Sequence, residues 1–185
     1  MQLLTRKFTV EQYHKMAQEQ ILDHQEHIEL IQGEIITMSP IGFRHASTIN
    51  RLLNAFLSLQ LADKTILSIQ NSISLGESSE PQPDLALLKP VENFYDDRLP
   101  TATDILLLIE VADSSLIYDR EIKVPLYAQH QIPEIWLINL TQNQLERYSD
   151  PQNNDYQNQS IFTPNQSLSP LAFPELTIPL KTILN

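Results

Sequence analysis

Hydrophobic residues recur at two intervals along this chain, one typical of β-strands and one typical of α-helices. The segment Ile28–Met38 contains two short apolar runs joined by Gln32 and Gly33, a pattern that predicts a β-hairpin with Gly33 at the turn. Apolar runs bounded by turn residues predict further strands at Thr65–Leu75, Asp84–Leu88, Ile105–Ala112, Glu134–Leu140, Gln144–Tyr148, Asp155–Phe162 and Leu176–Leu180.

Two segments near the start of the chain have helical patterns instead. Thr9 is followed three residues later by Gln12, as in a capping box, which predicts a short helix to about Gln20. From Phe43 to Leu61 the apolar residues recur at helical spacing, and the same stripe continued backwards reaches His45. We therefore expect His45 to face the protein interior. The residues that define the stripe are Ile49, Leu52, Leu53 and Phe56.

Strands dominate the middle of the chain and helices bracket them, which predicts an α/β (α+β) fold with a mixed sheet flanked by helices. The length of 185 residues fits a single domain, 1–185, in which 1–40 form an N-terminal helix and hairpin extension. No apolar segment approaches the roughly 20 residues of a membrane span, so we expect a cytoplasmic protein that does not enter a membrane.

Composition removes several classes of chemistry. The chain has no cysteine, which excludes disulfides, zinc–thiolate centres and thiol nucleophiles. It has only 3 glycines, and neither a Walker motif nor a dinucleotide-binding fingerprint is present. The remaining chemistry must come from carboxylates, amines, imidazoles and hydroxyls.

Two acidic residues in apolar surroundings are the first candidates. Glu110 lies inside the most apolar run of the chain, Ile105–Ala112, which predicts a buried strand. A buried carboxylate costs several kcal/mol unless it is paired or binds a metal. Asp84 ends a Pro-Gln-Pro-Asp segment and opens a neighbouring predicted strand. Together the two residues are candidate metal ligands.

The helix predicted at Asp119–His130 adds an amine to this pair. Asp119 is its expected N-cap, and Pro125 implies a bend or a late start of the helix. Asp119, Lys123 and Tyr127 are spaced by four residues and so lie on one side of the helix. Because this helix directly follows the Glu110 strand, we expect Lys123 to reach the end of that strand.

Two carboxylates and an amine suit the hydrolysis of a phosphodiester. Mg²⁺ prefers oxygen ligands and usually takes one or two carboxylates, with water and phosphate completing the coordination. A lysine can orient or deprotonate the attacking water and can donate to a phosphate oxygen. Each residue alone has an ordinary explanation: a turn for Asp84, an N-cap for Asp119, a solvated or Asp119-paired amine for Lys123, and a core histidine for His45.

The charge distribution bears on the substrate. The net charge of −11 is unlike that of most DNA-binding proteins. Residues 1–64 carry a net charge of only −1, however, and no carboxylate occurs between Ile35 and Ala62. Arg44 and Arg51 lie in that segment, which is either the approach for a polyanion or simply a neutral helix.

Several of these stretches occur together in a known family. The chain resembles the Uma-two group of endonuclease-like proteins, which belongs to the PD-(D/E)XK, restriction-endonuclease-like superfamily. The resemblance covers about residues 8–180. The matching stretches are Glu29–Glu34, Ser39-Pro40 followed by His45, Pro83-Asp84, Glu110–Ser115, Asp119, Lys123, Tyr127 and Ile132–Leu137.

The resemblance implies a restriction-endonuclease-like mixed sheet in which Asp84 and Glu110 hold a metal, with the backbone carbonyl of Val111 as a further ligand. The superfamily's lysine would stand at Ala112, where it is missing, and Lys123 resembles its migrated replacement. His45 and Glu34 match recurrent family positions and are given supporting roles, as are Asp119 and Tyr127.

The chain departs from the family pattern at Gln32, Gln131 and Asn139, where Asp, Gly and Asp are usual. None of these differences removes a proposed metal ligand. Gln131 and Asn139 leave open the form of the local turn and any supporting role near the site.

Three functions remain open from the sequence. The first is an endodeoxyribonuclease that uses Mg²⁺ (or Mn²⁺) and acts as a homodimer, because the strands of duplex DNA are related by a two-fold axis. The second is a catalytically silent module that binds nucleic acid or protein. The third is a structural domain in which Glu110 forms a salt bridge with an arginine or lysine away from any cleft.

Overall fold

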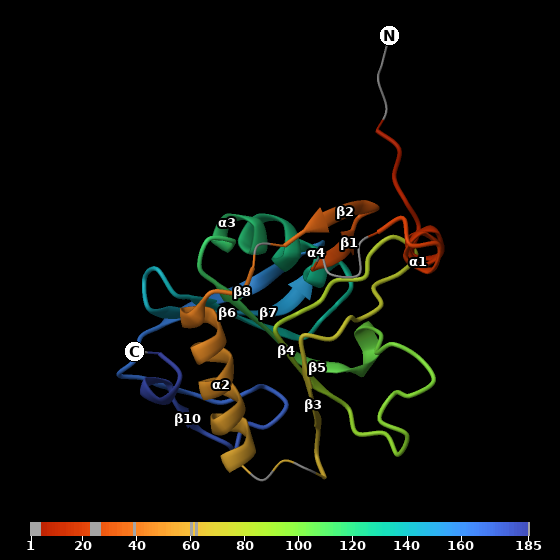
Figure 1. The fold of residues 1–185 in the computed structure, drawn as a ribbon. Helices are drawn as coiled ribbons and strands as arrows, with labels where there is room; N and C mark the ends of the chain where they lie inside the picture. Colours follow the sequence, from red (N-terminus) through yellow and green to blue (C-terminus); the bar gives the residue numbers. More distant parts are fainter. Residues whose placement is uncertain (1–4, 23–26, 39, 60, 62, 185) are drawn as a thin grey trace.

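A six-stranded mixed sheet forms the centre of the protein in a computed structural model that describes residues 5–22, 27–38, 40–59, 61 and 63–184 (Figure 1). The strand order is β3-β4-β5-β6-β7-β8, and neighbours are antiparallel except β5 and β6, which are parallel. The strands are β3 (Ile66–Ile69), β4 (Leu85–Leu88), β5 (Ile105–Ala112), β6 (Glu134–Asn139), β7 (Gln144–Gln152) and β8 (Asp155–Phe162).

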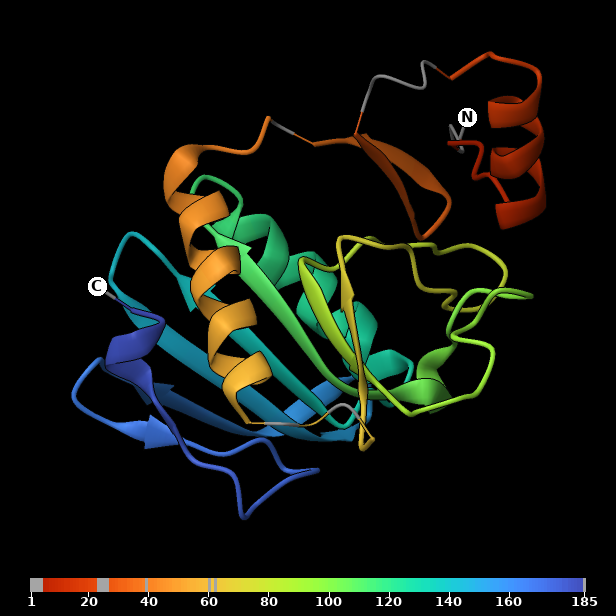
Figure 2. The same ribbon diagram turned by 60° about the horizontal axis from the view of Figure 1, so that its bottom comes forward.

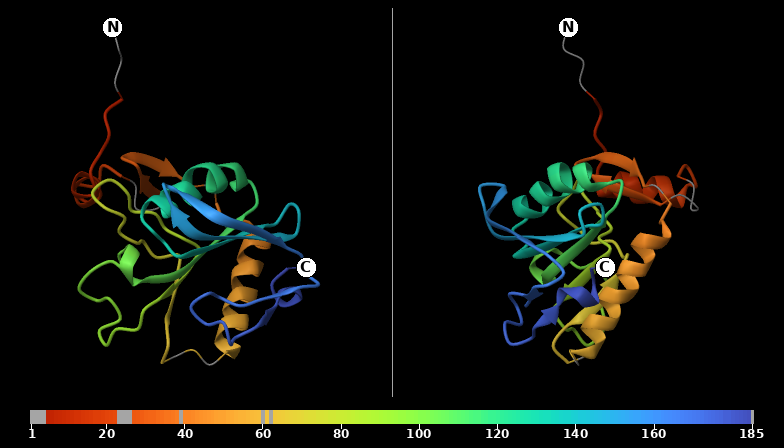
Figure 3. Two further views of the ribbon diagram at one scale, coloured as in Figure 1. Left: turned by 180° about the vertical axis from the view of Figure 1, so that it is seen from behind. Right: turned by 90° about the vertical axis from the view of Figure 1, so that its left-hand side faces the viewer.

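Helices cover both faces of this sheet (Figures 1 and 2). On one face lies α2 (Phe43–Ser58), beside a C-terminal segment that contains β9 (Ser167–Leu168), β10 (Ile178–Pro179) and the 3₁₀ turn η3 (Leu180–Thr182). The opposite face is covered by the crossover between β5 and β6, which contains α3 (Leu116–Tyr118), the π-helix η2 (Asp119–Lys123) and α4 (Val124–Gln129). The side view in Figure 3 shows the sheet between these two layers.

Two hydrophobic clusters hold the layers together. Phe56 of α2 packs on Trp136 of β6, with the ring centroids 6.0 Å apart. On the other face, Tyr127 and Leu126 of α4 are fully buried against the sheet. Each fully buried apolar side chain of this size contributes roughly 1.5–3 kcal/mol, so both helical layers are firmly attached to the sheet.

The N-terminal part consists of a helix and a separate two-stranded hairpin. Helix α1 (Val10–Gln18) starts with the predicted capping box, in which Thr9 and Gln12 bond each other's backbone N–H. The hairpin is made of β1 (Ile28–Ile31) and β2 (Glu34–Thr37). Gly33 takes a φ of 78° at the turn, where an added Cβ would lie 2.7 Å from Lys7 Cβ. The predicted helix and hairpin of residues 1–40 are both present.

Some predicted elements differ in extent. The strand predicted at 65–75 covers only Ile66–Ile69, because Gln70 takes a positive φ of 49° and turns the chain. The strand predicted at 176–180 is reduced to Ile178–Pro179, and the helix predicted to reach Leu61 ends at Ser58. Ser39, part of the predicted end of the hairpin, lies outside the described residues.

The prediction that Asp119 caps a helix is wrong. The helical segment starts at Leu116, three residues earlier, so Asp119 already has helical dihedral angles of φ −62° and ψ −43°. Pro125 falls in the first turn of α4, directly after the π-helix. Pro125 therefore follows an irregular turn rather than breaking a continuous α-helix.

Within the part of the chain that the structure describes, no helix is both long and apolar enough to cross a membrane.

Candidate functional site

Strands β4 and β5 bring the two predicted acidic residues together. In their antiparallel register Leu85 lies opposite Ile109, which places Asp84 beside the end of the Glu110 strand. The backbone N–H of Val111 donates to Asp84 Oδ2 at 2.8 Å. Glu110 projects toward α4, since its strand neighbours Leu108 and Ala112 belong to the core cluster on that face.

Asp84 is fixed from two further directions. His45 Nε2 lies 3.0 Å from Asp84 Oδ2, and Gln70 Nε2 donates to Asp84 Oδ1 at 3.3 Å. Burial alone would lower the pKa of His45, but the hydrogen bond and charge of Asp84 outweigh it and the pKa is raised. His45 therefore faces inward, as the helical stripe predicts, and holds the Asp84 carboxylate against β5.

Two of the three predicted helix residues, Lys123 and Tyr127, contact Glu110. Its Oε1 lies 3.1 Å from Lys123 Nζ and accepts a 2.5 Å hydrogen bond from the hydroxyl of Tyr127. Burial raises the pKa of Glu110 to about 8, opposed by the charge of Lys123 and reinforced by those of Asp84 and Asp119. The pKa of Lys123 is also raised, because the charges of Glu110 and Glu29 outweigh the effect of its burial.

The π-helix presents Asp119 and Lys123 to the same side. A backbone N–H from Val124 to the carbonyl of Asp119 closes the wide i→i+5 turn. Both side chains are buried, and Asp119 Oδ2 accepts a hydrogen bond from Ser115 Oγ at 2.6 Å. Burial raises the pKa of Asp119, partly offset by Lys123 and by the Ser115 hydrogen bond. Asp119 therefore contributes to the charge of the site rather than capping a helix.

Glu29 is a member of this cluster that sequence reasoning did not select. It lies on β1 with 1% of its surface exposed, and its Oε2 is 3.2 Å from Lys123 Nζ. The available signal was the one that identified Glu110, a carboxylate inside an apolar strand, here Ile28-Glu29-Leu30. The short run and its place in a hairpin made that signal weaker.

Three predicted residues lie outside the cluster. Glu34 is exposed on β2 and pairs with Lys7 at 2.5 Å, so it does not join Asp84 or Glu110. Arg44 is half-exposed at the start of α2, donates to the Leu140 carbonyl at 2.7 Å and lies 3.8 Å from Asp113. Arg51 is partly buried on the same helix.

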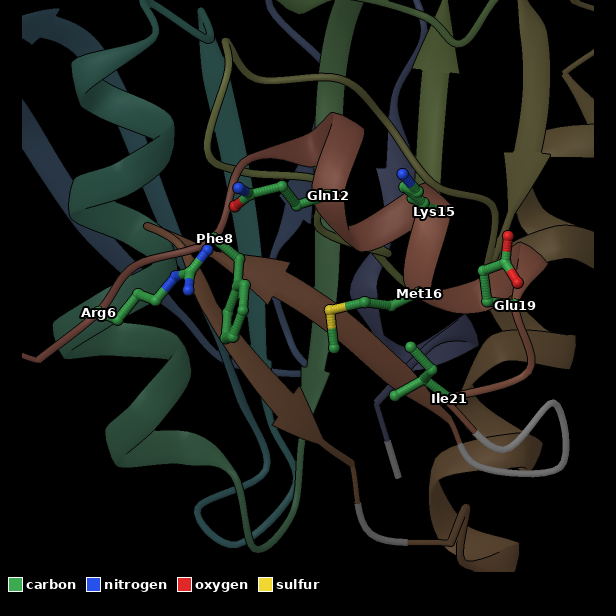
Figure 4. A pocket seen from close by; sticks show the side chains of 7 residues that line it. All are labelled: Arg6, Phe8, Gln12, Lys15, Met16, Glu19 and Ile21. Atoms are coloured by element: carbon green, nitrogen blue, oxygen red, sulfur yellow. The ribbon is translucent and has the colours of Figure 1, made fainter.

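A separate surface cavity of about 280 Å³ lies against α1 (Figure 4). It shares no residue with the carboxylate cluster. Its lining residues are Arg6, Phe8, Gln12, Lys15, Met16, Glu19 and Ile21.

The charge balance of the cluster favours a cation. Two other buried acids have an arginine of their own: Glu134 pairs with Arg147 at 2.9 Å, and Glu146 pairs with Arg120 at 2.6 Å. A third, Glu80, lies 2.6 Å from His14. In contrast, Glu29 and Glu110 share the single cation Lys123. The negative charges of Asp84 and Asp119 also raise the pKa of Glu110, so negative charge exceeds positive charge in the cluster.

The donor set also fits a hard divalent ion. Among the described residues, no three His, Cys, Asp or Glu side chains are arranged to hold a metal. A magnesium site needs only one or two carboxylates, because water and substrate oxygens complete the coordination. Asp84 and Glu110, which the β4–β5 register brings together, supply the two carboxylates that such a site needs.

Comparisons with known proteins bear on both fold and family. No curated protein matches the chain. A solved structure, described as a putative nuclease belonging to DUF820 from Anabaena variabilis, superimposes with a TM-score of 0.74 and 16% sequence identity. The match covers 95% of this chain and 97% of that one, which confirms the predicted fold, a mixed sheet flanked by helices. A family model described as "Putative restriction endonuclease" matches residues 10–181, so the chain belongs to the Uma2 family.

Proposed function

We propose that this protein is a metal-dependent endonuclease that hydrolyses phosphodiester bonds in DNA. The observation that carries the proposal is the meeting of Asp84 and Glu110 at the β4–β5 junction, with Lys123 Nζ 3.1 Å from Glu110. Membership in the Uma2 family supports a nuclease. The choice of DNA and the use of Mg²⁺ or Mn²⁺ are parts of the proposal.

Asp84, Glu110 and the carbonyl of Val111 are the proposed ligands of the metal. The bound ion would activate water and offset the negative charge that develops on the phosphate. His45 keeps the Asp84 carboxylate turned toward β5 through its 3.0 Å hydrogen bond. Gln70 holds the other Asp84 oxygen, so the side chain has little freedom to rotate. The carboxylate is thereby held in place before substrate arrives.

Lys123 acts as a cation rather than as a base. Its raised pKa keeps the amine protonated at neutral pH. Two of its three donor directions face Glu110 and Glu29, and the third can donate to a phosphate oxygen or to the attacking water. An ammonium group held in a buried site stabilises charge that appears only in the transition state.

The approach of DNA is proposed along the first turns of α2. This helix lies in the nearly neutral first third of the chain and carries Arg44, half-exposed, close to the loop that follows β5. The same helix carries His45, which touches Asp84. A symmetric homodimer would present two such sites to the two strands of a duplex.

A silent binding module with the same fold is the second candidate. The observation that favours it is the net charge of −11, which opposes DNA binding. One experiment distinguishes the nuclease from the silent module. Plasmid, single-stranded DNA and RNA are incubated with purified protein in Mg²⁺, Mn²⁺ or EDTA.

We expect nicked and linear plasmid with either metal and none with EDTA. The products are followed on agarose gels against the Lys123→Ala variant as control. Equal inertness of the wild type and Lys123→Ala, with metal still bound, would contradict the nuclease proposal and favour the silent module. Cleavage confined to RNA would contradict the choice of DNA.

Metal affinity is expected to rise with pH. Burial raises the pKa of Glu110 to about 8, so between pH 6 and 8 the metal competes with a proton for this carboxylate. A ligand must lose its proton to bind, so affinity increases by up to about tenfold per pH unit over this range. Calorimetric titration with Mn²⁺ at pH 6, 7 and 8 measures the trend. A constant affinity would show that Glu110 is not a ligand.

A further inference from the structure

Glu29 is buried beside the proposed site but has no role in the chemistry proposed above. It belongs to the N-terminal hairpin, which forms a two-stranded sheet separate from the central one. Nevertheless its carboxylate is almost completely buried and reaches Lys123 at 3.2 Å. A buried carboxylate is retained at a cost of several kcal/mol unless its partners are well placed.

The same oxygen of Glu29 has a second partner. The backbone N–H of Gln82 donates to Glu29 Oε2 at 3.1 Å. Gln82 stands two residues before Asp84 and also donates from its side chain to the Gln70 carbonyl at 2.5 Å. One oxygen atom therefore connects the loop that presents Asp84 with the helix that presents Lys123.

The hairpin is rigidly attached to that loop. The N–H of Glu80 donates to the Leu30 carbonyl at 2.7 Å, and the N–H of Gly33 donates to the Ser78 carbonyl at 2.7 Å. Ser79 Oγ accepts from the backbone of Gln32 at 2.9 Å. These bonds, made by the residues that directly follow Glu29, hold the hairpin against the loop, so the position of the Glu29 carboxylate does not depend on Lys123 alone.

We propose that Glu29 is a positioning residue of this site: it holds the Lys123 ammonium beside Glu110 and ties it to the Asp84 loop. This inference rests on the proposed nuclease function. Without Glu29, Lys123 retains Glu110 as partner, and its Nζ is expected to move onto that carboxylate and away from the phosphate. The N-terminal hairpin thereby becomes part of the site rather than an extension beside it.

The test uses Glu29→Gln, which removes the charge but retains an oxygen that can accept from Gln82. We expect kcat for plasmid cleavage to fall about 10- to 100-fold, the range usual for residues that orient a site. KM for DNA and the affinity for Mn²⁺ are expected to stay within about twofold. Glu34→Gln, on the exposed side of the same hairpin, is the matched control and should leave all three unchanged.

Three results would overturn the inference. Full kcat in Glu29→Gln would show that Lys123 needs no second carboxylate. A loss of Mn²⁺ affinity as large as that of Asp84→Asn would make Glu29 a metal ligand instead. A fall in kcat that tracks a fall in melting temperature, and disappears at lower temperature, would reduce its role to stability.

A spectroscopic measurement keeps the inference separate from the nuclease proposal. The Nζ resonance of Lys123, assigned with Lys123→Met in ¹⁵N-lysine protein, reports the partners of the ammonium without any cleavage. We expect this resonance to shift, and its protons to exchange faster, in Glu29→Gln but not in Glu34→Gln. If wild-type protein cleaves nothing, the nuclease proposal fails while this readout still tests the positioning. An unchanged resonance would overturn the positioning itself.

Discussion

Replacing Asp84 by Asn or Glu110 by Gln is expected to abolish both metal binding and DNA cleavage. Each change removes one of the two carboxylates proposed to hold the ion, and Glu110→Gln also removes the group that pairs with Lys123. Changes outside the ligands already cost 10- to 100-fold in metal affinity, so loss of a ligand should exceed about 100-fold. Titration with Mn²⁺ and single-turnover cleavage measure the two effects.

The matched control for this experiment is Asp113→Asn. Asp113 follows the same strand but is nearly half-exposed and lies 3.8 Å from Arg44 rather than in the cluster. Its affinity for Mn²⁺ should match that of the wild type. Circular dichroism should show all three variants folded, since both site changes are nearly isosteric. Wild-type affinity in Asp84→Asn or Glu110→Gln would refute the proposed ligand set.

Replacing Lys123 by Met is expected to produce the second large effect, on activity and stability together. Loss of one donor that acts on transition-state charge lowers the rate about 100- to 1,000-fold. The change also leaves the buried carboxylates of Glu29 and Glu110 without their shared cation. Breaking a buried ion pair in this way costs about 3–5 kcal/mol.

The loss of stability in Lys123→Met should depend on pH. The pKa of Glu110 is raised by burial to about 8 and rises further once Lys123 is gone. A protonated Glu110 needs no cation, so the destabilisation should be smaller at pH 6 than at pH 9. Urea unfolding without metal at both pH values measures this difference.

Lys64→Met provides the comparison for an exposed pair. Lys64 lies 3.2 Å from Glu175, and both side chains are about half-exposed. Its replacement should change stability by at most about 1 kcal/mol at either pH. A pH-independent loss in Lys123→Met, no larger than that of Lys64→Met, would mean that the buried charges of the site are not coupled.

Local patterns predicted the elements that carry the site. The apolar run around Glu110 defined β5 correctly because a strand buried on both faces leaves an unbroken hydrophobic signature. The four-residue spacing of Asp119, Lys123 and Tyr127 predicted that they share one side, and the structure brings the last two onto Glu110. Such patterns depend only on nearby residues.

The position of Glu29 could not be predicted in the same way. Its partners, Gln82 and Lys123, lie far along the chain, and nothing local indicates that the hairpin packs against the loop before Asp84. Likewise, the Asp119 cap was wrong because tertiary packing extends the helix back to Leu116. These features depend on long-range packing, which residue patterns do not encode directly.

The π-helix determines how many side chains of the helical segment between β5 and β6 point in the same direction. In a regular α-helix each residue advances about 100°, so side chains four apart drift by about 40° and those eight apart by about 80°. Asp119 and Tyr127 are eight apart, and at that drift they would face different directions. The wider turn at Asp119–Lys123 rotates less per residue and subtracts from the drift. The irregular turn thus gives this stretch of helix a near-straight line of side chains.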